Sequence, residues 1–182
     1  MTDRELVRRV RRGDGGAFDQ LVHRYLRPAL AVAWEFTESR DDAEDVVQDA
    51  FHRALRGLDG YDEGRPFRPW FFQIVRNVGR NAAAWRNRWS SEPVDETLAI
   101  DETSGLTEIE RWEVRKRIDD GLELLSPMQR SCFRLCDVEE YSAVEVAEML
   151  GMNDSTVRVH LFRARQALRE ILRPLREEAG SQ

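Results

Sequence analysis

The sequence predicts an all-α protein built of two small helical domains joined by an acidic linker. Three observations support this fold class. Apolar residues recur every three or four positions through most of the 182 residues, and no stretch alternates as a strand does. The periodicity fades after Ser90, where the composition becomes acidic and polar. Tyr141 to Arg169 has the pattern of two helices joined by a tight turn. We therefore expect an N-terminal domain over residues 1–89, a linker over 90–106 and a C-terminal domain over 107–182.

The N-terminal domain is predicted to contain four helices. The first spans residues 3–12 and ends in a glycine-rich break, the second covers residues 18–36, and the third covers 41–55. Three glycines and two prolines between positions 57 and 69 then require a loop or bent connection. Residues 70–89 form the fourth helix, and its inward face is expected to be Trp70, Ile74, Val78 and Ala82.

The third helix carries an acidic face. Its alanines and valines lie on one side, which leaves carboxylates and Gln48 outside, with Phe51 and Leu55 at the edge. This pattern favours docking onto a basic protein surface, steered by charge and anchored by the apolar residues. A solvated acidic face is one alternative. A metal-carboxylate nuclease or hydrolase is another, but Glu-x-x-His pairs and a nucleophile with its base are missing, so we expect no enzyme, metal or cofactor.

The fourth helix and the loop before it interleave arginines with aromatic residues. Positions 65–88 hold six arginines and no acid. Arginine contacts phosphates and aromatic rings stack on unpaired bases, so the segment is typical of single-strand binding. Some of the aromatics must form the core, and exposed stacking is expected of Tyr61 or Phe67 in the loop.

The C-terminal pair of helices predicts a duplex DNA reader. Ser142 and Glu145 form a capping box, and Gly151 allows the sharp turn. In the second helix Val157, Leu161, Ala164, Leu168 and Ile171 share an inward face. Residues 154–176 contain six arginines and two acids, a charge that suits phosphate contact and guanine reading. The outward residues are Ser155, Thr156, Arg158, Val159, Arg163, Gln166 and Arg169.

The charge map indicates more than one partner. The net charge of -6 hides alternating acidic and basic blocks, and the acidic blocks favour a second partner with a basic surface. No apolar run is long enough to span a membrane and the N-terminus has no signal-peptide core, so we expect a cytoplasmic protein. Cys132 and Cys136 are expected to be buried thiols.

Taken in order, these segments resemble the extracytoplasmic-function (ECF) group of the bacterial sigma-70 family. The sequence Asp42-Ala43-Glu44-Asp45 with Gln48 and Phe51 looks like region 2.2, and residues 58–68 look like the region 2.3 loop. Residues 69–88, with the core WFFQIVRN, look like region 2.4. The segment from Leu125-Ser126-Pro127 onward resembles region 4.

The resemblance implies a promoter-specific subunit of RNA polymerase with two partners on the enzyme, the β′ clamp and the β flap. It further implies promoter DNA, both duplex and unpaired non-template strand, and an anti-sigma factor. Residues implied in polymerase docking are Asp42, Glu44, Asp45, Gln48, Phe51 and Leu55. Residues implied at the -10 element are Tyr61, Arg65, Phe67, Arg68, Arg76, Asn77, Arg80 and Asn81, and those at the -35 element are Ser155, Thr156, Arg158, Val159, Arg163 and Arg165.

Three features depart from the family pattern: the Arg-Asn-Arg-Trp end of region 2.4 is less basic than usual, and two single positions differ. Asn81 stands where aspartate is frequent, and Phe162 stands where a small polar residue is common. Phe162 projects near the DNA side of the recognition helix, where it could meet a thymine methyl group, pack on the polymerase flap or mark a misplaced helix face. The rival interpretation of the whole chain is an autonomous helix-turn-helix regulator whose N-terminal domain senses a ligand or dimerises.

Overall fold

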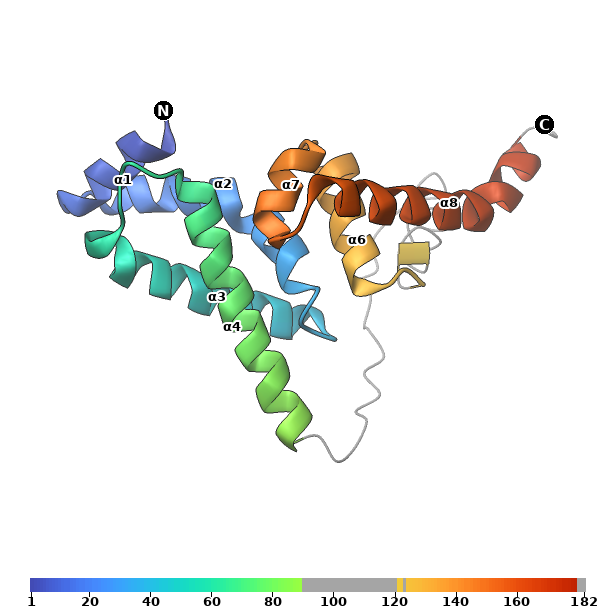
Figure 1. Cartoon of the computed structure of the whole chain (residues 1–182), viewed down its shortest axis with the longest axis horizontal. Coiled ribbons are helices and arrows are strands. Elements are labelled where there is room, and N and C mark those ends of the chain that lie inside the picture. The colour runs from blue at the N-terminus through green and yellow to red at the C-terminus, as the bar shows by residue number, and fades with distance from the viewer. Residues whose placement is uncertain (90–120, 123, 180–182) are drawn as a thin grey trace, which may run out of the picture.

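The computed structural model describes residues 1–89, 121–122 and 124–179, and all of its regular elements there are helical. The predicted linker and most of the predicted helix at 107–125 lie outside the described residues. The elements are α1 (Asp3–Arg11), α2 (Gly15–Ala33), α3 (Arg40–Gly57), η1 (Leu58–Gly60), α4 (Phe67–Trp89), α6 (Pro127–Phe133), η2 (Arg134–Val138), α7 (Ala143–Leu150) and α8 (Asp154–Ala179). Figure 1 shows α1 to α4 as one group and α6 to α8 as a second group beside it.

Local sequence signals account for the helix boundaries. Thr2, Ser126 and Ser142 each accept a hydrogen bond from the backbone three residues on, and each has the reciprocal bond of a capping box. Gly151 ends α7 with φ of 68°, the left-handed conformation that the sequence predicts for it. Helix α4 begins at Phe67, three residues earlier than predicted, because a proline at position 69 is tolerated in the first turn of a helix.

The first four helices close around an aromatic core. Leu6, Leu21, Tyr25, Phe71 and Phe72 are almost fully buried there. The ring of Phe51 stacks on that of Phe71 with 4.7 Å between centroids, which joins α3 to α4. Ring pairs of this kind stabilise a core beyond the area they bury.

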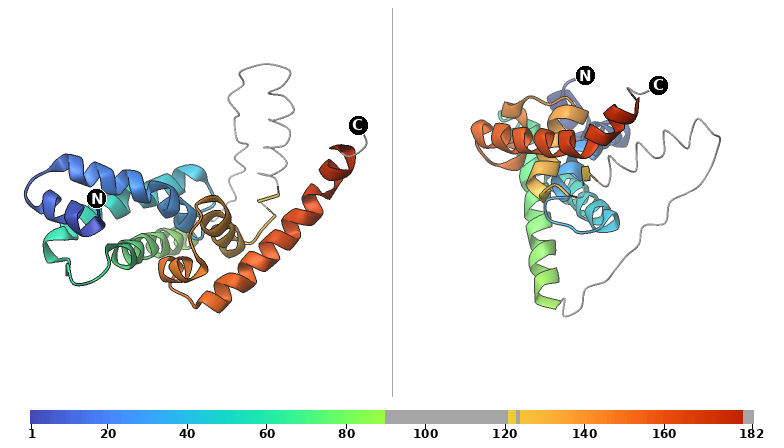
Figure 2. Two further views of the ribbon diagram at one scale, coloured as in Figure 1. Left: turned by 90° about the horizontal axis from the view of Figure 1, so that it is seen from above. Right: turned by 90° about the vertical axis from the view of Figure 1, so that its right-hand side faces the viewer.

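The second group of helices shares this core instead of standing apart. Cys132, Leu135, Val146, Met149 and Leu150 belong to the same buried cluster as the core of α1 to α4. Among the described residues a second, smaller cluster of Leu122, Leu125, Ala164 and Leu168 joins α8 to the segment before α6. Helix α7 packs against α4, and α6 with η2 packs against α2, whereas α8 runs along the far side of α6 and α7 (Figure 2). The two predicted domains are therefore held together in a closed arrangement, which the sequence did not predict.

Candidate polymerase and nucleic-acid interfaces

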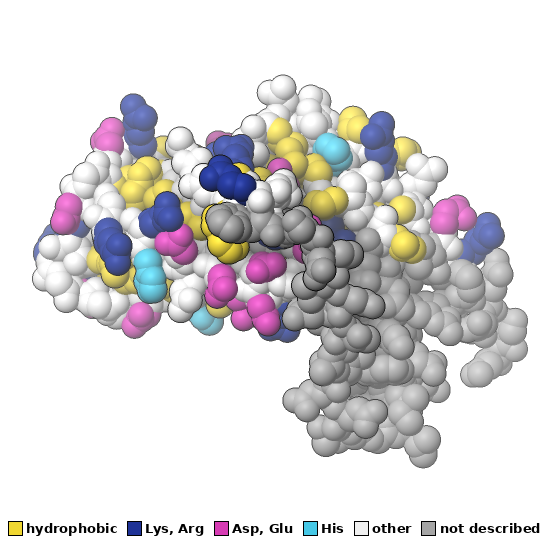
Figure 3. Space-filling view, turned by 90° about the horizontal axis from the view of Figure 1, so that it is seen from below, with side chains coloured by type: hydrophobic (Ala, Val, Ile, Leu, Met, Phe, Trp, Pro, Cys, Tyr) yellow, Lys and Arg dark blue, Asp and Glu magenta, His cyan; other side chains and the backbone are white. Residues whose placement is uncertain are grey.

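The acidic face of α3 lies on the surface, as predicted. Ser39 caps the helix, and its alanines and valines at positions 43, 46, 47, 50 and 54 point into the core. Asp45 and Gln48 are exposed between two local ion pairs, Arg40 with Glu44 at 2.8 Å and Arg53 with Asp49 at 2.9 Å. Acidic side chains gather on the side of the molecule seen from below, where α3 lies (Figure 3). Asp45 has no ion-pair partner among the described residues and is available to a basic partner.

The edge of this face differs from the prediction at one residue. Phe51 was expected at the surface as an anchor, but it is buried between α3, α4 and Phe18 and makes no part of the exposed face. Its ring fills the space between two helices that cross closely, and burial there outweighs any gain at the surface. Leu55, one turn later, is exposed as expected.

The described residues contain no group of three or more side chains placed to hold a metal ion. Asp49, a member of the carboxylate series considered as a metal site, is instead paired with Arg53. No described helix is both long and apolar enough to cross a membrane.

The loop before α4 corrects a second prediction. Tyr61 and Phe67 were expected to be exposed for base stacking, but their side chains are only 6% and 3% exposed. Tyr61 packs against Phe67 and Trp70 and donates a hydrogen bond from its hydroxyl to the backbone oxygen of Arg65. The rings thus form the floor of the loop, whereas Arg65 is 82% exposed above it.

The buried face of α4 is shifted from the predicted one. Phe71, Phe72, Val75 and Val78 are the buried residues, while Trp70, Ile74 and Ala82 are only partly covered. A strict step of four drifts around a helix of 3.6 residues per turn, so only Val78 of the predicted stripe lies on the buried face and the other three lie at its edge. On the opposite side Asn77, Arg80 and Asn81 are exposed and remain available for DNA.

Two other residues expected at the -10 element are engaged by α7. Arg68 forms an ion pair with Glu145 at 2.7 Å, and its guanidinium lies 5.5 Å from the ring of Tyr141. Arg76 donates hydrogen bonds to the backbone oxygens of Glu148, at 3.3 Å, and Met149. These oxygens end α7 and carry the negative end of its dipole, which suits a cation. The closed arrangement therefore places α7 over part of the predicted -10 surface.

The contact between α4 and α7 shifts the pKa values of the charged groups that form it. Burial, and then the like charge of Arg80, lower the pKa of Arg76. Hydrogen bonds from the Ser142 backbone and hydroxyl hold the pKa of Glu145 below its usual value, with a further contribution from Arg68. Glu145 is thus an ionised carboxylate that caps its own helix and binds Arg68 at the same time.

Further contacts between the two helix groups come from residues that sequence reasoning did not select. Ser131 is fully buried and donates a hydrogen bond of 2.7 Å to the backbone oxygen of Ala31. The guanidinium groups of Arg130 and Arg134 lie 5.8 and 5.6 Å from the centre of the Trp34 ring. Cation–ring contacts of this kind stabilise the interface between the two helix groups. No periodic pattern distinguishes these residues in the sequence, because their partners lie about a hundred positions away.

Helix α8 presents the predicted recognition face. Val157, Leu161, Ala164 and Leu168 are buried, as expected, and the side chain of Ile171 lies outside the described residues. Ser155, Thr156, Arg163, Gln166 and Arg169 are exposed, and Val159 is about half exposed. Arg158 pairs with Asp154 at 3.0 Å, and Arg165 pairs with Asp137 at 2.5 Å, so the Arg165 guanidinium is bound at the side of the helix.

Phe162 lies on the outer side of this helix. It is 67% exposed and lines a shallow groove of 380 Å³ together with Leu161, Gln166 and three arginines. The predicted helix face is therefore correct at this position, and Phe162 is a surface residue.

Comparison with known proteins agrees with both halves of this geometry. Residues 21–90 match the family model Sigma-70 region 2, and residues 115–168 match Sigma-70, region 4. The chain is 30% identical over 190 residues to the RNA polymerase sigma-H factor of Pseudomonas aeruginosa, with 97% of each protein covered. It is 33% identical over 185 residues to the ECF RNA polymerase sigma-E factor of Escherichia coli K12, with 96% of each covered.

Two solved structures have a similar fold, and one of them is named a sigma factor. CnrH in complex with the cytosolic domain of CnrY superposes with a TM-score of 0.63 at 30% identity, over 94% of this chain and 97% of that one. The sigma factor RpoE of Bartonella quintana, in complex with the anti-sigma factor NepR, gives a TM-score of 0.62 at 26% identity, over 86% of this chain and 96% of that one. An acidic helix, an arginine-rich helix and a helix-turn-helix occur here in a chain that matches these relatives over nearly its whole length. The chain therefore belongs to the ECF group of the sigma-70 family and is an alternative sigma factor for promoter-specific transcription.

Proposed function

We propose that this sigma factor docks on the β′ clamp of core RNA polymerase through the exposed face of α3. Asp45 and Gln48 carry this proposal, because they are exposed and lie beside the exposed Leu55, with Asp42 and Glu44 completing the acidic row. Charged residues at the rim of an interface speed association, and an apolar side chain beside them provides an anchor. Phe51 supports the face from below, through its packing on Phe71.

We further propose that α4 and its preceding loop contact the -10 element and that α8 contacts the -35 element. Three of the residues implied at the -10 element, Asn77, Arg80 and Asn81, are exposed on α4, and an arginine and two asparagines suit phosphates and base edges. The cost of extruding a base is a few kcal/mol, which contacts to arginine and aromatic residues can offset once polymerase anchors the complex. Promoter opening would then take place at the loop, with Arg65 exposed above its aromatic floor.

The exposed residues of α4 and α8 carry this model, and the engagement of Arg68 and Arg76 by α7 adds a requirement to it. In the closed arrangement these arginines cannot bind DNA, and the two DNA-reading helices belong to one packed body. Assembly with polymerase would have to separate α4 from α7 before both elements can be contacted. The net charge of -6 adds to this, so the free chain should bind promoter DNA weakly.

An anti-sigma factor would favour the closed arrangement only if it binds that arrangement. The solved relatives CnrH and RpoE are bound to CnrY and NepR, and a similar partner of this chain would stabilise whichever arrangement it binds. Its action would take place in the cytoplasm, where polymerase and the chromosome are.

The test combines co-elution with transcription. Core polymerase is mixed with the wild-type chain, Asp45→Arg or Asp19→Arg, where Asp19 is an exposed acid on α2 and provides the same charge change away from α3. We expect co-elution to be lost for Asp45→Arg alone. In vitro transcription on genomic fragments, with mapped start sites, then identifies both promoter elements. Equal co-elution of the two variants would refute docking through α3, and the absence of specific start sites would refute the promoter-reading model.

A further inference from the structure

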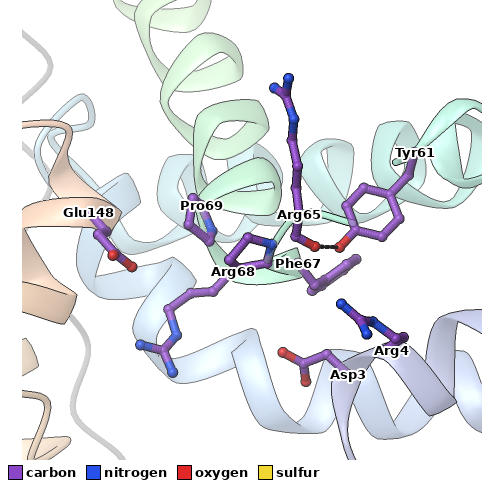
Figure 4. Close-up of a pocket in the computed structure, with 9 residues that line it drawn as sticks. Asp3, Arg4, Tyr61, Arg65, Phe67, Arg68, Pro69 and Glu148 are labelled. Atoms are coloured by element: carbon purple, nitrogen blue, oxygen red, sulfur yellow. Dashed lines mark hydrogen bonds between the residues drawn. The ribbon is translucent and has the colours of Figure 1, made fainter. Parts of the chain in front are cut away.

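A pocket of 290 Å³ joins the predicted -10 loop to the N-terminal helix. Its walls include Tyr61, Phe67 and Arg68 from the loop and α4, Glu148 from α7, and Asp3 and Arg4 from α1. Figure 4 shows Arg4 below the Phe67 ring, with Tyr61 on the other side of that ring, whereas Arg65 extends away from Arg4. Helix α1 lies before the residues that match Sigma-70 region 2, which begin at position 21.

Helix α1 is fixed to the loop by a set of polar contacts. Arg11 donates hydrogen bonds of 2.9 Å to the backbone oxygen of Leu58 and 2.5 Å to that of Tyr61. It also pairs with Glu63 at 2.6 Å, and Arg8 pairs with the same carboxylate at 2.7 Å. Helix α1 is therefore not a loose N-terminal extension, because Arg8 and Arg11 hold it in a defined position relative to the loop.

Asp3 and Arg4 differ in their availability. The Asp3 carboxylate accepts a hydrogen bond of 2.5 Å from the Tyr25 hydroxyl and also binds Arg24, so its oxygens are engaged within the protein. Arg4 forms no hydrogen bond or ion pair with the described residues. The charge of Arg4 acts on Tyr61. Burial and then Asp3 raise the pKa of the Tyr61 hydroxyl, and Arg4 opposes that shift. The pocket thus contains a cation held near an aromatic floor and free to bind an anionic group.

We propose that Arg4 is a DNA-contacting residue that donates to a phosphate of the unpaired non-template strand, next to the nucleotide extruded at the loop. The inference rests on the proposed role of the loop and adds α1 to the -10 interface. A planar guanidinium can donate to two phosphate oxygens at once. Arg4 is exposed and lines the pocket, so a phosphate can reach its guanidinium from solvent. Arg11 is the positioning residue, because it ties the loop to the helix that bears Arg4.

The test uses holoenzyme reconstituted from core polymerase and the full chain. The probe is a fluorescent single-stranded oligonucleotide with the non-template sequence of a promoter that the wild-type holoenzyme transcribes, plus versions with each -10 base replaced. The variants are Arg4→Ala, Arg4→Lys and Arg65→Ala, with Arg12→Ala as the matched control. Arg12 is an exposed arginine that follows α1 and does not line the pocket. Thermal unfolding of each variant checks that the fold is intact.

We expect Arg4→Ala to weaken binding about fivefold on every oligonucleotide, because a phosphate contact does not depend on the base. The slope of log affinity against log salt should become shallower by about 0.7, the value for one phosphate contact on a single strand. Arg4→Lys should restore that slope, and Arg12→Ala should match the wild type.

Three results would overturn the proposal. Equal affinities of Arg4→Ala and Arg12→Ala would show that Arg4 makes no contact. A loss confined to the matched -10 sequence would indicate a base contact instead of a phosphate contact. A loss that Arg4→Lys repeats with an unchanged salt slope would indicate a structural role. If Arg65→Ala weakens binding and Arg4→Ala does not, the proposed function of the loop stands and only this inference fails.

Discussion

Arg76 offers the most direct test of the closed arrangement. Replacing it by glutamine removes the donor to the last backbone oxygens of α7, because the shorter side chain does not reach them. No DNA is needed for this test, so the proposed role of Arg76 at the promoter does not complicate it.

The expected effect follows from the two hydrogen bonds and from the burial of the guanidinium. A hydrogen bond to a charged group contributes about 1.5 to 3 kcal/mol. Burial of Arg76 lowers its pKa and offsets part of this gain, so we take about 1.5 kcal/mol for the pair of bonds. Since about 1.4 kcal/mol corresponds to a factor of ten, the open fraction should rise about tenfold.

Cys132 provides the measurement. It is fully buried in the core shared by the two helix groups, and burial raises the pKa of its thiol to about 12. A thiol reagent can therefore label it only after opening. In a Cys136→Ser background, the labelling rate of Arg76→Gln should exceed that of the parent about tenfold, if closing is faster than labelling.

Arg88→Gln is the control, because Arg88 is an exposed arginine near the end of α4, away from α7. Equal labelling rates of Arg76→Gln and Arg88→Gln would refute the reasoning. A labelling rate that follows the free energy of global unfolding, measured in urea, would show that Cys132 reacts from the unfolded chain and would refute it as well.

Three further predictions concern single residues. Gly151→Ala should destabilise the protein by about 1 to 2 kcal/mol in urea unfolding, because Gly151 has φ of 68° and a Cβ there would lie 3.2 Å from the Arg76 guanidinium carbon; an unchanged midpoint would contradict this. Burial raises the pKa of Glu35 above its ordinary value of 4.5, although Arg80 and Arg76 oppose the shift. Between pH 4.5 and the raised pKa the folded state therefore binds more protons than the unfolded state, and the free energy of unfolding falls as the pH rises through this range. Glu35→Gln should therefore raise the melting temperature at pH 7 but not below pH 4.5. Glu38→Gln, at an exposed position, should not raise the melting temperature at either pH. Phe162→Ala should leave the melting temperature unchanged and reduce transcription from the protein's own promoters, and full transcription would show that the exposed ring has no role there.

The sequence predicted the helices and the recognition face because those depend on local signals. The capping boxes at Ser126 and Ser142 and the left-handed turn at Gly151 require only residues a few positions apart. The described inward residues of α8 were predicted correctly because their spacing of three and four follows the helical period.

Predictions failed where the partner was distant in the chain. Phe51, Tyr61 and Phe67 were expected at the surface because an aromatic residue beside charges can serve either a core or a binding site, and only tertiary packing decides which. The contacts of Arg68 and Arg76 with α7 cross more than seventy positions, so no spacing in the sequence indicated them. The same holds for Arg4, whose role depends on how α1 meets the loop.

The shared core affects how prone the protein is to aggregate when it has no partner. When the two helix groups separate, apolar side chains such as Leu135, Val146 and Met149 lose their cover. Contiguous apolar patches of this kind drive aggregation in monomeric proteins. Chains produced in excess of polymerase therefore depend on the closed arrangement to stay dispersed, and either half expressed alone should be prone to precipitation. The amount of this protein relative to its partners should therefore determine how much of it aggregates.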